Sequence, residues 1–345
     1  MPLSPGGPTD DSGEGVPLGS MSPTGARCAG RAAPTVDTAA DHRGRRDPRE
    51  YRMTSTAPTI GTTTTTVPTS RVTAANNTTY AYRRFGTSTD GVPLVFLMHF
   101  RGNLDNWDPA LVDPIAAGRE VILVDNAGVG ASTGTVPSTV AQMAVDLLAF
   151  TDALGIRRFD VFGFSLGGFV AQDLALLRPW AVRNLVLAGT GPAGAPTMHG
   201  WREDIERESR QDIPSAENLL YIFFAHTETS RSLGIEFLRR LGGRTEDRDE
   251  PTTAAVRDAQ YDAVLAWGIP DISKLERLTA IRQPTLVLQG DDDLMIRTPG
   301  SHTLAGLIPD ARLHVFPDAA HASIFQYPAE AAALVDQFLT TASAA

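Results

Sequence analysis

The chain has 345 residues, of which 42% are hydrophobic and 20% charged, as in a globular protein with ample material for a core. Its formal net charge is −10, and no basic face emerges along the chain, which argues against nucleic acid as a partner. The single cysteine, Cys28, excludes an intrachain disulfide and argues against a cysteine-ligated metal site.

No run of about 20 apolar residues is present, so we expect neither a membrane span nor a membrane partner. The N-terminus also lacks a basic segment followed by an apolar one, the pattern of a secretory signal. We therefore expect a cytoplasmic protein. The oligomeric state is not readable from the sequence, and a homodimer is left open.

Residues 1–67 form the first segment of the chain. They are rich in Pro, Gly, Thr and Ser, include "TTTTT" at 62–66, and show no helical or strand periodicity. Such a composition cannot bury enough apolar surface to fold. We predict a disordered N-terminal extension.

From residue 69 the sequence becomes regular. "SRVTAANNTTYAYRRFG" alternates around an Asn-Asn turn and predicts a β-hairpin. Short continuous apolar runs then predict strands buried on both faces, at 93–100, 120–126, 159–164, 182–189, 284–290 and 311–316. Amphipathic stretches between them predict helices, at 138–155, 166–180, 299–309 and 328–342. This alternation predicts an α/β domain with a mostly parallel sheet.

One segment interrupts the alternation. Residues 192–276 contain no convincing strand and carry helical patterns rich in aromatic and charged residues. We interpret them as a helical cap inserted between two parts of one core, 68–191 and 277–345. Such an insertion would cover the carboxyl ends of the strands, where open α/β folds bind ligands.

A serine between glycines lies where a predicted strand meets a predicted helix. "GFSLGG" (163–168) matches G-x-S-x-G, the turn that exposes a nucleophilic serine, here Ser165. Gly163 and Gly167 would clear space around the strained turn. The helix that follows would direct its first amides at an oxyanion formed on the substrate.

A nucleophilic serine needs a base and an acid that orients the base. Of the seven histidines, His321 follows the last strand in a small-residue loop suited to a catalytic imidazole; an ordinary loop histidine is the alternative. The acid is sought in "GDDD" (290–293), after a buried strand. These aspartates would otherwise be a solvated turn or a metal site, but a metal would need further oxygen ligands that are absent nearby. We choose Asp293, since one of the three must point inward.

The order Ser165, Asp293, His321 and the surrounding motifs resemble the α/β-hydrolase superfamily, in its branch with a serine nucleophile and a helical cap. The resemblance covers residues 69–343 and rests on "GFSLGG", "GDDD", "DAAHASIFQYP" and "VDNAGVGAST". It implies an α/β-hydrolase fold with an eight-stranded, mostly parallel sheet flanked by helices. It also places the acid at Asp293 rather than at its two neighbours.

The resemblance further implies an oxyanion hole, in which the amide of Leu166 is one donor. The family's loop usually begins His-Gly, whereas this chain reads "HFRG" at 99–102, so the second donor is Phe100, or Arg101 if the alignment shifts by one. His99 and Arg101 are candidates for the substrate pocket. Arg101 would alternatively pair with nearby aspartates or be a loop charge.

The remaining candidate of this loop is Trp107, either a pocket residue or a packing residue. The motifs together imply a serine hydrolase that cleaves an ester or lactone of a small molecule, with no metal and no cofactor. A cofactor-free haloperoxidase or perhydrolase has the same three residues, and a receptor-like homologue with slow turnover is a further alternative. Dehalogenases and epoxide hydrolases are disfavoured, because they carry aspartate where this chain has Ser165.

Overall fold

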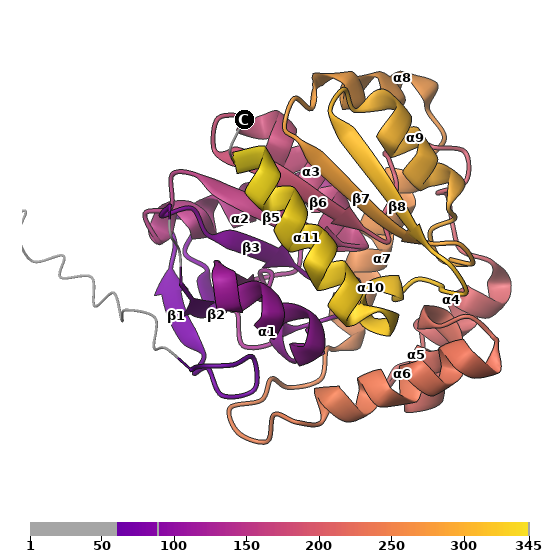
Figure 1. The fold of residues 1–345 in the computed structure, drawn as a ribbon, viewed down its shortest axis with the longest axis horizontal. Helices are drawn as coiled ribbons and strands as arrows, with labels where there is room; N and C mark the ends of the chain where they lie inside the picture. The colour runs from indigo at the N-terminus through magenta and orange to yellow at the C-terminus, as the bar shows by residue number, and fades with distance from the viewer. Residues whose placement is uncertain (1–60, 88–89, 344–345) are drawn as a thin grey trace, which may run out of the picture. The chain divides into compact units, whose positions relative to one another are not determined.

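The computed structural model describes residues 61–87 and 90–343. Their strands form one sheet with the spatial order β1-β2-β4-β3-β5-β6-β7-β8 (Figure 1). β1 pairs antiparallel with β2 and β2 with β4, whereas β3 to β8 run parallel, which confirms the predicted sheet. The strands are β1 Ser70–Thr73, β2 Thr79–Gly86, β3 Leu94–Leu97, β4 Glu120–Val124, β5 Phe159–Phe164, β6 Val182–Ala188, β7 Thr285–Gly290 and β8 Ala311–Phe316.

The inner strands are buried along their whole length, because both faces of the sheet are covered. Every residue of β3, β4, β5 and β7 is buried, whereas the edge strand β1 alternates between half-buried and exposed residues. Neighbouring apolar side chains stack across the sheet, as in the pair Phe96 and Phe162, whose ring centroids lie 4.9 Å apart. This burial explains why the inner strands read as continuous apolar runs in the sequence.

Helices cover both faces of the sheet (Figure 1). On one face α1 (Pro109–Gly118) packs against α11 (Pro328–Ser343), and on the other α2 (Val140–Ala153) packs against α3 (Leu166–Leu177). Helix α9 (Pro299–Leu307) packs on β7 and β8. All of these helices except α1 were predicted, with ends that differ by a few residues.

Helix α1 was missed because its sequence carries two helix-breaking signals. Pro109 is its first residue, a position where the missing N–H costs nothing, and Asp108 caps the helix by accepting from the Ala110 amide. Pro114 lies inside the helix, where a proline normally ends or kinks it. Burial of the apolar face, including Leu111 and Ile115, outweighs this local penalty.

Five α-helices and one short 3-10 helix, Arg277–Ala280, lie between β6 and β7, where a helical cap was predicted (Figure 1). The α-helices are α4 Glu203–Ser209, α5 Ala216–Phe223, α6 Glu228–Leu241, α7 Ala254–Gly268 and α8 Ile272–Glu276. The cap touches the carboxyl ends of the strands: Arg101, just after β3, bonds to the end of α4, and Ala322, after β8, bonds to the end of α5. The cap therefore lies over the edge of the sheet where the candidate residues gather.

The predicted disordered extension ends too late in the sequence. Residues 61–67 pack on the domain: the Thr64 amide donates to Asp113 (2.7 Å), and the Val67 carbonyl accepts from Arg244 (2.9 Å). Val67 is buried, so these residues contribute to the core despite their threonine-rich composition. The rest of the predicted extension, residues 1–60, lies outside the described residues.

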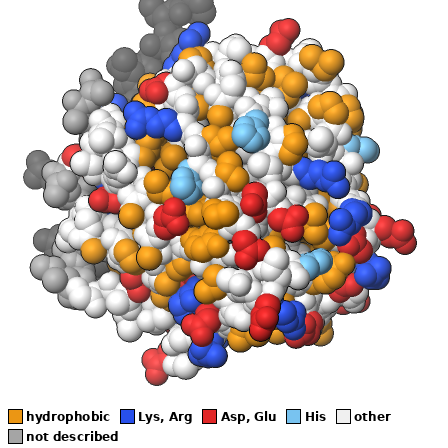
Figure 2. All heavy atoms as spheres, turned by 45° about the vertical axis from the view of Figure 1, so that its right-hand side comes forward, with side chains coloured by type: hydrophobic (Ala, Val, Ile, Leu, Met, Phe, Trp, Pro, Cys, Tyr) orange, Lys and Arg blue, Asp and Glu red, His pale blue; other side chains and the backbone are white. Residues whose placement is uncertain are grey.

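The surface around the β8 edge and the cap carries acidic, basic and apolar side chains interspersed (Figure 2). Within the described part of the chain, no helix is both long and apolar enough to cross a membrane.

Candidate active site

Ser165 lies at a sharp turn between β5 and α3. Its φ and ψ angles are 55° and −117°, a strained conformation for a residue with a side chain. A Cβ on Gly163 would come within 2.5 Å of the Gly167 carbonyl oxygen, and one on Gly167 within 2.1 Å of the Leu97 carbonyl oxygen. The strand and helix approach so closely that both positions require glycine. The Thr190 hydroxyl donates to the Ser165 carbonyl (2.9 Å) and supports the turn.

The three residues expected to form a triad meet at hydrogen-bond distance. Nε2 of His321 lies 2.9 Å from the Ser165 hydroxyl, and Nδ1 of His321 lies 2.8 Å from Oδ2 of Asp293. All three are buried. A carboxylate only accepts hydrogen bonds, so Nδ1 carries the ring proton and Nε2 is left to accept from the serine. This arrangement suits proton transfer from the serine to the imidazole.

The three consecutive aspartates after β7 have different surroundings. Asp291 and Asp292 are exposed, whereas Asp293 is buried. Oδ1 of Asp293 accepts from the amides of Met295 and Ile296, both at 2.8 Å. These bonds hold the carboxylate in place and leave Oδ2 to face the imidazole.

A further residue, Gln289, holds the second oxygen of this carboxylate. Its Nε2 donates to Oδ2 of Asp293 (3.0 Å) and to the Ile296 carbonyl (2.9 Å), while its Oε1 accepts from Ser301 (2.9 Å). Gln289 is fully buried at the end of β7. It was missed in the sequence, although a glutamine inside the apolar run "TLVLQG" is a signal that an amide is needed there.

Two backbone amides are available beside the serine. Among the described residues, the N–H groups of Leu166 and Phe100 donate to no protein acceptor, whereas the Arg101 amide donates to Oε1 of Gln260 (2.6 Å). Of the two alternatives for the second oxyanion donor, the geometry favours Phe100, because the Arg101 amide is already engaged. Leu166 is the first residue of α3, where helix amides point toward a bound anion.

The side chains of this loop point into the cap. The Phe100 ring packs edge-on against Trp201, with centroids 5.3 Å apart. The Arg101 guanidinium donates to the backbone carbonyls of Ser209, Gln211 and Asp212 at 3.3, 2.5 and 2.9 Å. Arg101 lines a cavity beside the candidate triad, but its guanidinium is bound to backbone carbonyls of the cap.

The expected alternative partners of Arg101 are engaged elsewhere. Asp105 accepts from Arg83 (2.8 Å), and Asp108 pairs with Arg240 (2.6 Å). The interpretation of Arg101 as a salt-bridge partner of these aspartates is therefore wrong. Instead of pairing with an aspartate, the Arg101 guanidinium donates to backbone carbonyls at the end of α4 and just after it.

His99 is buried beside the candidate triad. Its ring lies edge-on between Phe164 and Phe223, with centroid distances of 5.4 and 5.0 Å, and its Nδ1 lies 2.7 Å from the Phe100 carbonyl oxygen. The pKa of His99 is lowered to about 4, mainly by burial, and the nearby His321 contributes in the same direction. His99 is therefore neutral near pH 7 and donates from Nδ1 to that carbonyl.

Trp107 does not border the cavity. It is buried in the core, where its ring lies edge-on to Phe96 (5.0 Å) and to Phe162 (5.8 Å). The interpretation of Trp107 as a pocket residue is wrong, and the packing alternative describes it correctly.

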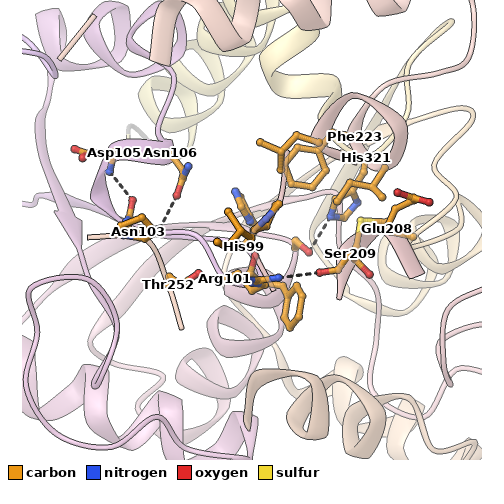
Figure 3. A pocket seen from close by; sticks show the side chains of 18 of the residues that line it. His99, Arg101, Asn103, Asp105, Asn106, Glu208, Ser209, Phe223, Thr252 and His321 are labelled. Carbon is orange, nitrogen blue, oxygen red and sulfur yellow. Dashed lines mark hydrogen bonds between the residues drawn. The ribbon is translucent and has the colours of Figure 1, made fainter. Parts of the chain in front are cut away.

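A cavity of about 380 Å³ opens beside the candidate triad. Figure 3 shows its two ends: Phe223 and His321 lie at one, and Asn103, Asp105 and Asn106 lie at the other, with His99 between them. Its apolar lining includes Ile213, Pro214, Leu219, Ile222 and Met295, whereas Glu208 and Ser209 lie at the same end as His321. The far end is polar.

An acid pair lies near the polar end. Asp125, after β4, is buried and accepts from the amides of Leu104 (2.9 Å) and Ala131 (3.2 Å). Asp249 of the cap lies beside it, and one of its carboxylate oxygens has no other partner among the described residues. Burial, reinforced by the charge of Asp249, raises the pKa of Asp125 well above its usual range. The pKa of Asp249 is raised as well, in the first place by burial.

No group of three or more His, Cys, Asp or Glu side chains among the described residues is placed to hold a metal ion. The aspartates after β7 turn to different surroundings instead of converging. Chemistry without a metal or cofactor stays a prediction of the sequence.

The fold and the motifs agree with the known families. The model of a family described as alpha/beta hydrolase fold matches residues 92–328. Since this match spans well over half of the chain, the protein belongs to the α/β-hydrolase fold family.

Individual relatives differ in the activities that their names give. The chain is 31% identical over 231 residues to a 2-hydroxymuconate semialdehyde hydrolase of Pseudomonas putida, which covers 66% of this chain and 79% of the relative. It is 28% identical over 263 residues to a putative non-heme bromoperoxidase of Mycobacterium tuberculosis, covering 72% and 92%. The solved structure of an α/β-hydrolase fold protein from Chitinophaga pinensis is 42% identical, with a TM-score of 0.76, and covers 81% and 99%.

Proposed function

We propose that the protein is a serine hydrolase that cleaves a carboxylic ester or lactone of a small molecule through an acyl-enzyme. The observation that carries this proposal is the continuous chain of hydrogen bonds from Ser165 through His321 to Asp293, beside a cavity. An activated serine of this kind attacks carbonyl carbon.

In the first half of the reaction, His321 takes the Ser165 proton at Nε2 as the serine oxygen bonds to the substrate carbonyl carbon. Asp293 stabilises the resulting imidazolium through Nδ1. The amides of Leu166 and Phe100 donate to the oxyanion. Collapse of the tetrahedral intermediate breaks the bond to the alcohol oxygen, which leaves with the proton from His321.

In the second half, water replaces the alcohol. His321 removes a proton from this water as its oxygen attacks the acyl carbon. Breakdown of the second tetrahedral intermediate returns the proton to Ser165 and frees the carboxylic acid. In a lactone the alcohol and acid remain one molecule, and both steps are unchanged.

The cavity supports a small substrate. Its volume of about 380 Å³ lies in the range that holds one small organic molecule. Its apolar lining residues would contact the hydrocarbon portion of the substrate, and Asn103 and Asn106 at the far end would bind a polar group.

The test combines a panel of esters and lactones with fluorophosphonate labelling of the purified protein. We expect turnover and labelling of the wild type, loss of both in Ser165→Ala, and retention of both in the exposed control Ser273→Ala. A wild type that turns over nothing in the panel and resists labelling would overturn the proposal. Labelling without turnover would point to the slow, receptor-like alternative.

A second candidate function is perhydrolysis, favoured by the similarity to the putative bromoperoxidase. Hydrogen peroxide would then replace water as the nucleophile that attacks the acyl-enzyme, and the product would be a peracid. Incubation with acetate and hydrogen peroxide, followed by detection of peracetic acid, separates the two functions. Peracid formation that depends on Ser165 and exceeds ester turnover would favour perhydrolysis.

A further inference from the structure

The cap reaches into the loop that supplies the second oxyanion donor. Arg101 has a φ of 64°, in the left-handed region that residues with side chains rarely adopt. Its amide donates to Oε1 of Gln260, at 2.6 Å, and Gln260 belongs to cap helix α7. The backbone of a core loop is thus held by a side chain from an inserted domain, 159 residues further along the chain.

Both ends of Arg101 are fixed by the cap. Gln260 accepts from the backbone amide of Arg101. The Arg101 guanidinium donates to three backbone carbonyls, one at the end of α4 and two just after it. A strained backbone conformation persists only where the surroundings hold it in place. Here those surroundings are the cap bonds to Arg101, together with the turn bond from the Gly102 amide to the His99 carbonyl (3.0 Å).

The direction of this bond determines which amide of the loop stays free of a protein acceptor. With the Arg101 N–H turned to Gln260, the preceding N–H, that of Phe100, is the one left without a protein acceptor. If the Arg101 amide were released, the peptide between Phe100 and Arg101 would be held only through its carbonyl, by His99 (2.7 Å), and by the turn bond from the Gly102 amide to the His99 carbonyl (3.0 Å). The direction of the Phe100 amide would then be less well fixed.

The chemistry of Gln260 indicates what its side chain is for. The residue is fully buried, yet its Nε2 has no partner among the described residues. Burying an unpaired amide is unfavourable, so the acceptor oxygen must contribute something that an apolar residue would not. That oxygen has one partner, the Arg101 amide.

We propose that Gln260 is a positioning residue that aims the Phe100 amide at the substrate oxyanion by holding the Arg101 amide. The cap thereby completes half of the oxyanion hole besides covering the cavity. This inference rests on the proposed hydrolase function. It adds a residue outside every motif of the sequence to the machinery of the reaction.

The decisive variant is Gln260→Met, which keeps the volume and removes the acceptor. We expect kcat on an ester to fall by about 10- to 100-fold, the effect of a slightly misplaced catalytic group, with KM changed by less than about 3-fold. The affinity for a trifluoromethyl ketone, whose adduct with Ser165 places an oxyanion in the hole, should fall in parallel with kcat.

Two further variants separate positioning from folding. Gln260→Glu retains an acceptor oxygen at the same reach from the Arg101 amide and should recover most of kcat. Gln283→Met removes a buried glutamine that bonds to the carbonyls of Ala175 and Pro179 in the core, and should leave kcat unchanged even if the unfolding midpoint falls. If Gln260→Met does not fold, Gln260→Asn, which withdraws the acceptor by one methylene, takes its place.

The inference is overturned if the wild type hydrolyses esters and the folded Gln260→Met protein does so with the same kcat, or if Gln260→Glu is as impaired as Gln260→Met. It also fails if kcat falls without a parallel loss of ketone affinity. A wild type that neither hydrolyses esters nor reacts with fluorophosphonate is a different result, since it removes the proposed function itself.

Discussion

The backbone N–H of Ala322 donates to the carbonyl oxygen of Phe223 at 2.8 Å, so the residue after His321 is tied to the end of cap helix α5. A second link lies close by: the Ser230 hydroxyl of α6 donates to Oε1 of Gln326 (2.6 Å) in the loop and helix that follow His321. The cap therefore holds the histidine loop as well as the Phe100–Arg101 loop. We infer that it is a fixed part of the site.

The first prediction concerns the link at Ser230. Its buried hydroxyl also accepts from the Ala225 amide (2.9 Å), so Ser230→Ala leaves a donor and an acceptor unpaired inside the protein. We expect the free energy of unfolding to fall by about 1–3 kcal/mol in urea denaturation. Ser232→Ala, at an exposed position of the same helix, is the matched control and should change it by less than about 0.5 kcal/mol. Equal effects of the two variants would contradict the prediction.

The second prediction distinguishes the three aspartates after β7. In Asp293→Asn, an amide NH₂ group facing His321 and Gln289 would meet two donors, and the imidazole would be driven into the wrong tautomer. We expect kcat to fall by on the order of 10³- to 10⁴-fold.

The controls for this prediction are the two neighbours, because they lose the same charge from exposed positions. Asp291→Asn and Asp292→Asn should each retain kcat within about 2-fold. Comparable losses in all three variants, measured on one ester at saturation, would mean that the acid is not Asp293.

Much of the fold and the candidate triad was predictable because local sequence patterns encode them. Continuous apolar runs mark strands buried on both faces, and the glycines around Ser165 mark a close approach of strand and helix. Asp293 was predictable because one of three adjacent acids had to turn inward. These features depend on residues near one another in the chain or on the fixed order of the strands.

The features that escaped prediction depend on contacts between distant segments. Arg101 bonds to carbonyls of the cap more than 100 residues away, and Gln260 acts through one oxygen on a loop backbone, which no spacing pattern reports. Trp107 lies close to the loop in sequence, yet its side chain turns into the core between Phe96 and Phe162. The direction of a side chain after a turn is set by tertiary packing.

The third prediction concerns the buried His99. Since its pKa is lowered to about 4, the folded protein binds fewer protons at this ring than the unfolded chain does between pH about 4 and 6.5. Its contribution to stability is therefore present above pH 6.5 and is lost as the pH falls through this window. In His99→Asn, which keeps a donor for the Phe100 carbonyl, that loss should disappear.

The measurement is urea denaturation at pH 7.5 and pH 4.5. We expect the wild type to lose on the order of 1–3 kcal/mol more than His99→Asn between these pH values. His302→Asn, a change at an exposed histidine, should follow the wild type. Parallel losses in the wild type and His99→Asn would show that His99 is not held neutral by burial.

The fourth prediction concerns the acid pair of Asp125 and Asp249, whose pKa values are both raised, in the first place by burial. A carboxyl group with a raised pKa binds more protons in the folded protein than in the unfolded chain, so its contribution to stability is greatest below its ordinary pKa near 4 and declines as the pH rises toward the raised value. The pair therefore destabilises the folded protein progressively above pH 4.

Asp249→Asn should reduce this decline, because it removes one of the two titrating groups and the charge that adds to burial in raising the pKa of Asp125. Asp125 is the poorer choice for substitution, since both its oxygens accept from backbone amides. We expect the variant to be more stable than the wild type at pH 8, by about 1 kcal/mol or more, and the difference to shrink toward pH 5. Asp262→Asn loses the same charge from an exposed site on α7 and should show no such pH-dependent difference. A constant offset between Asp249→Asn and the wild type across this range would mean that the titration of Asp249 is not linked to stability.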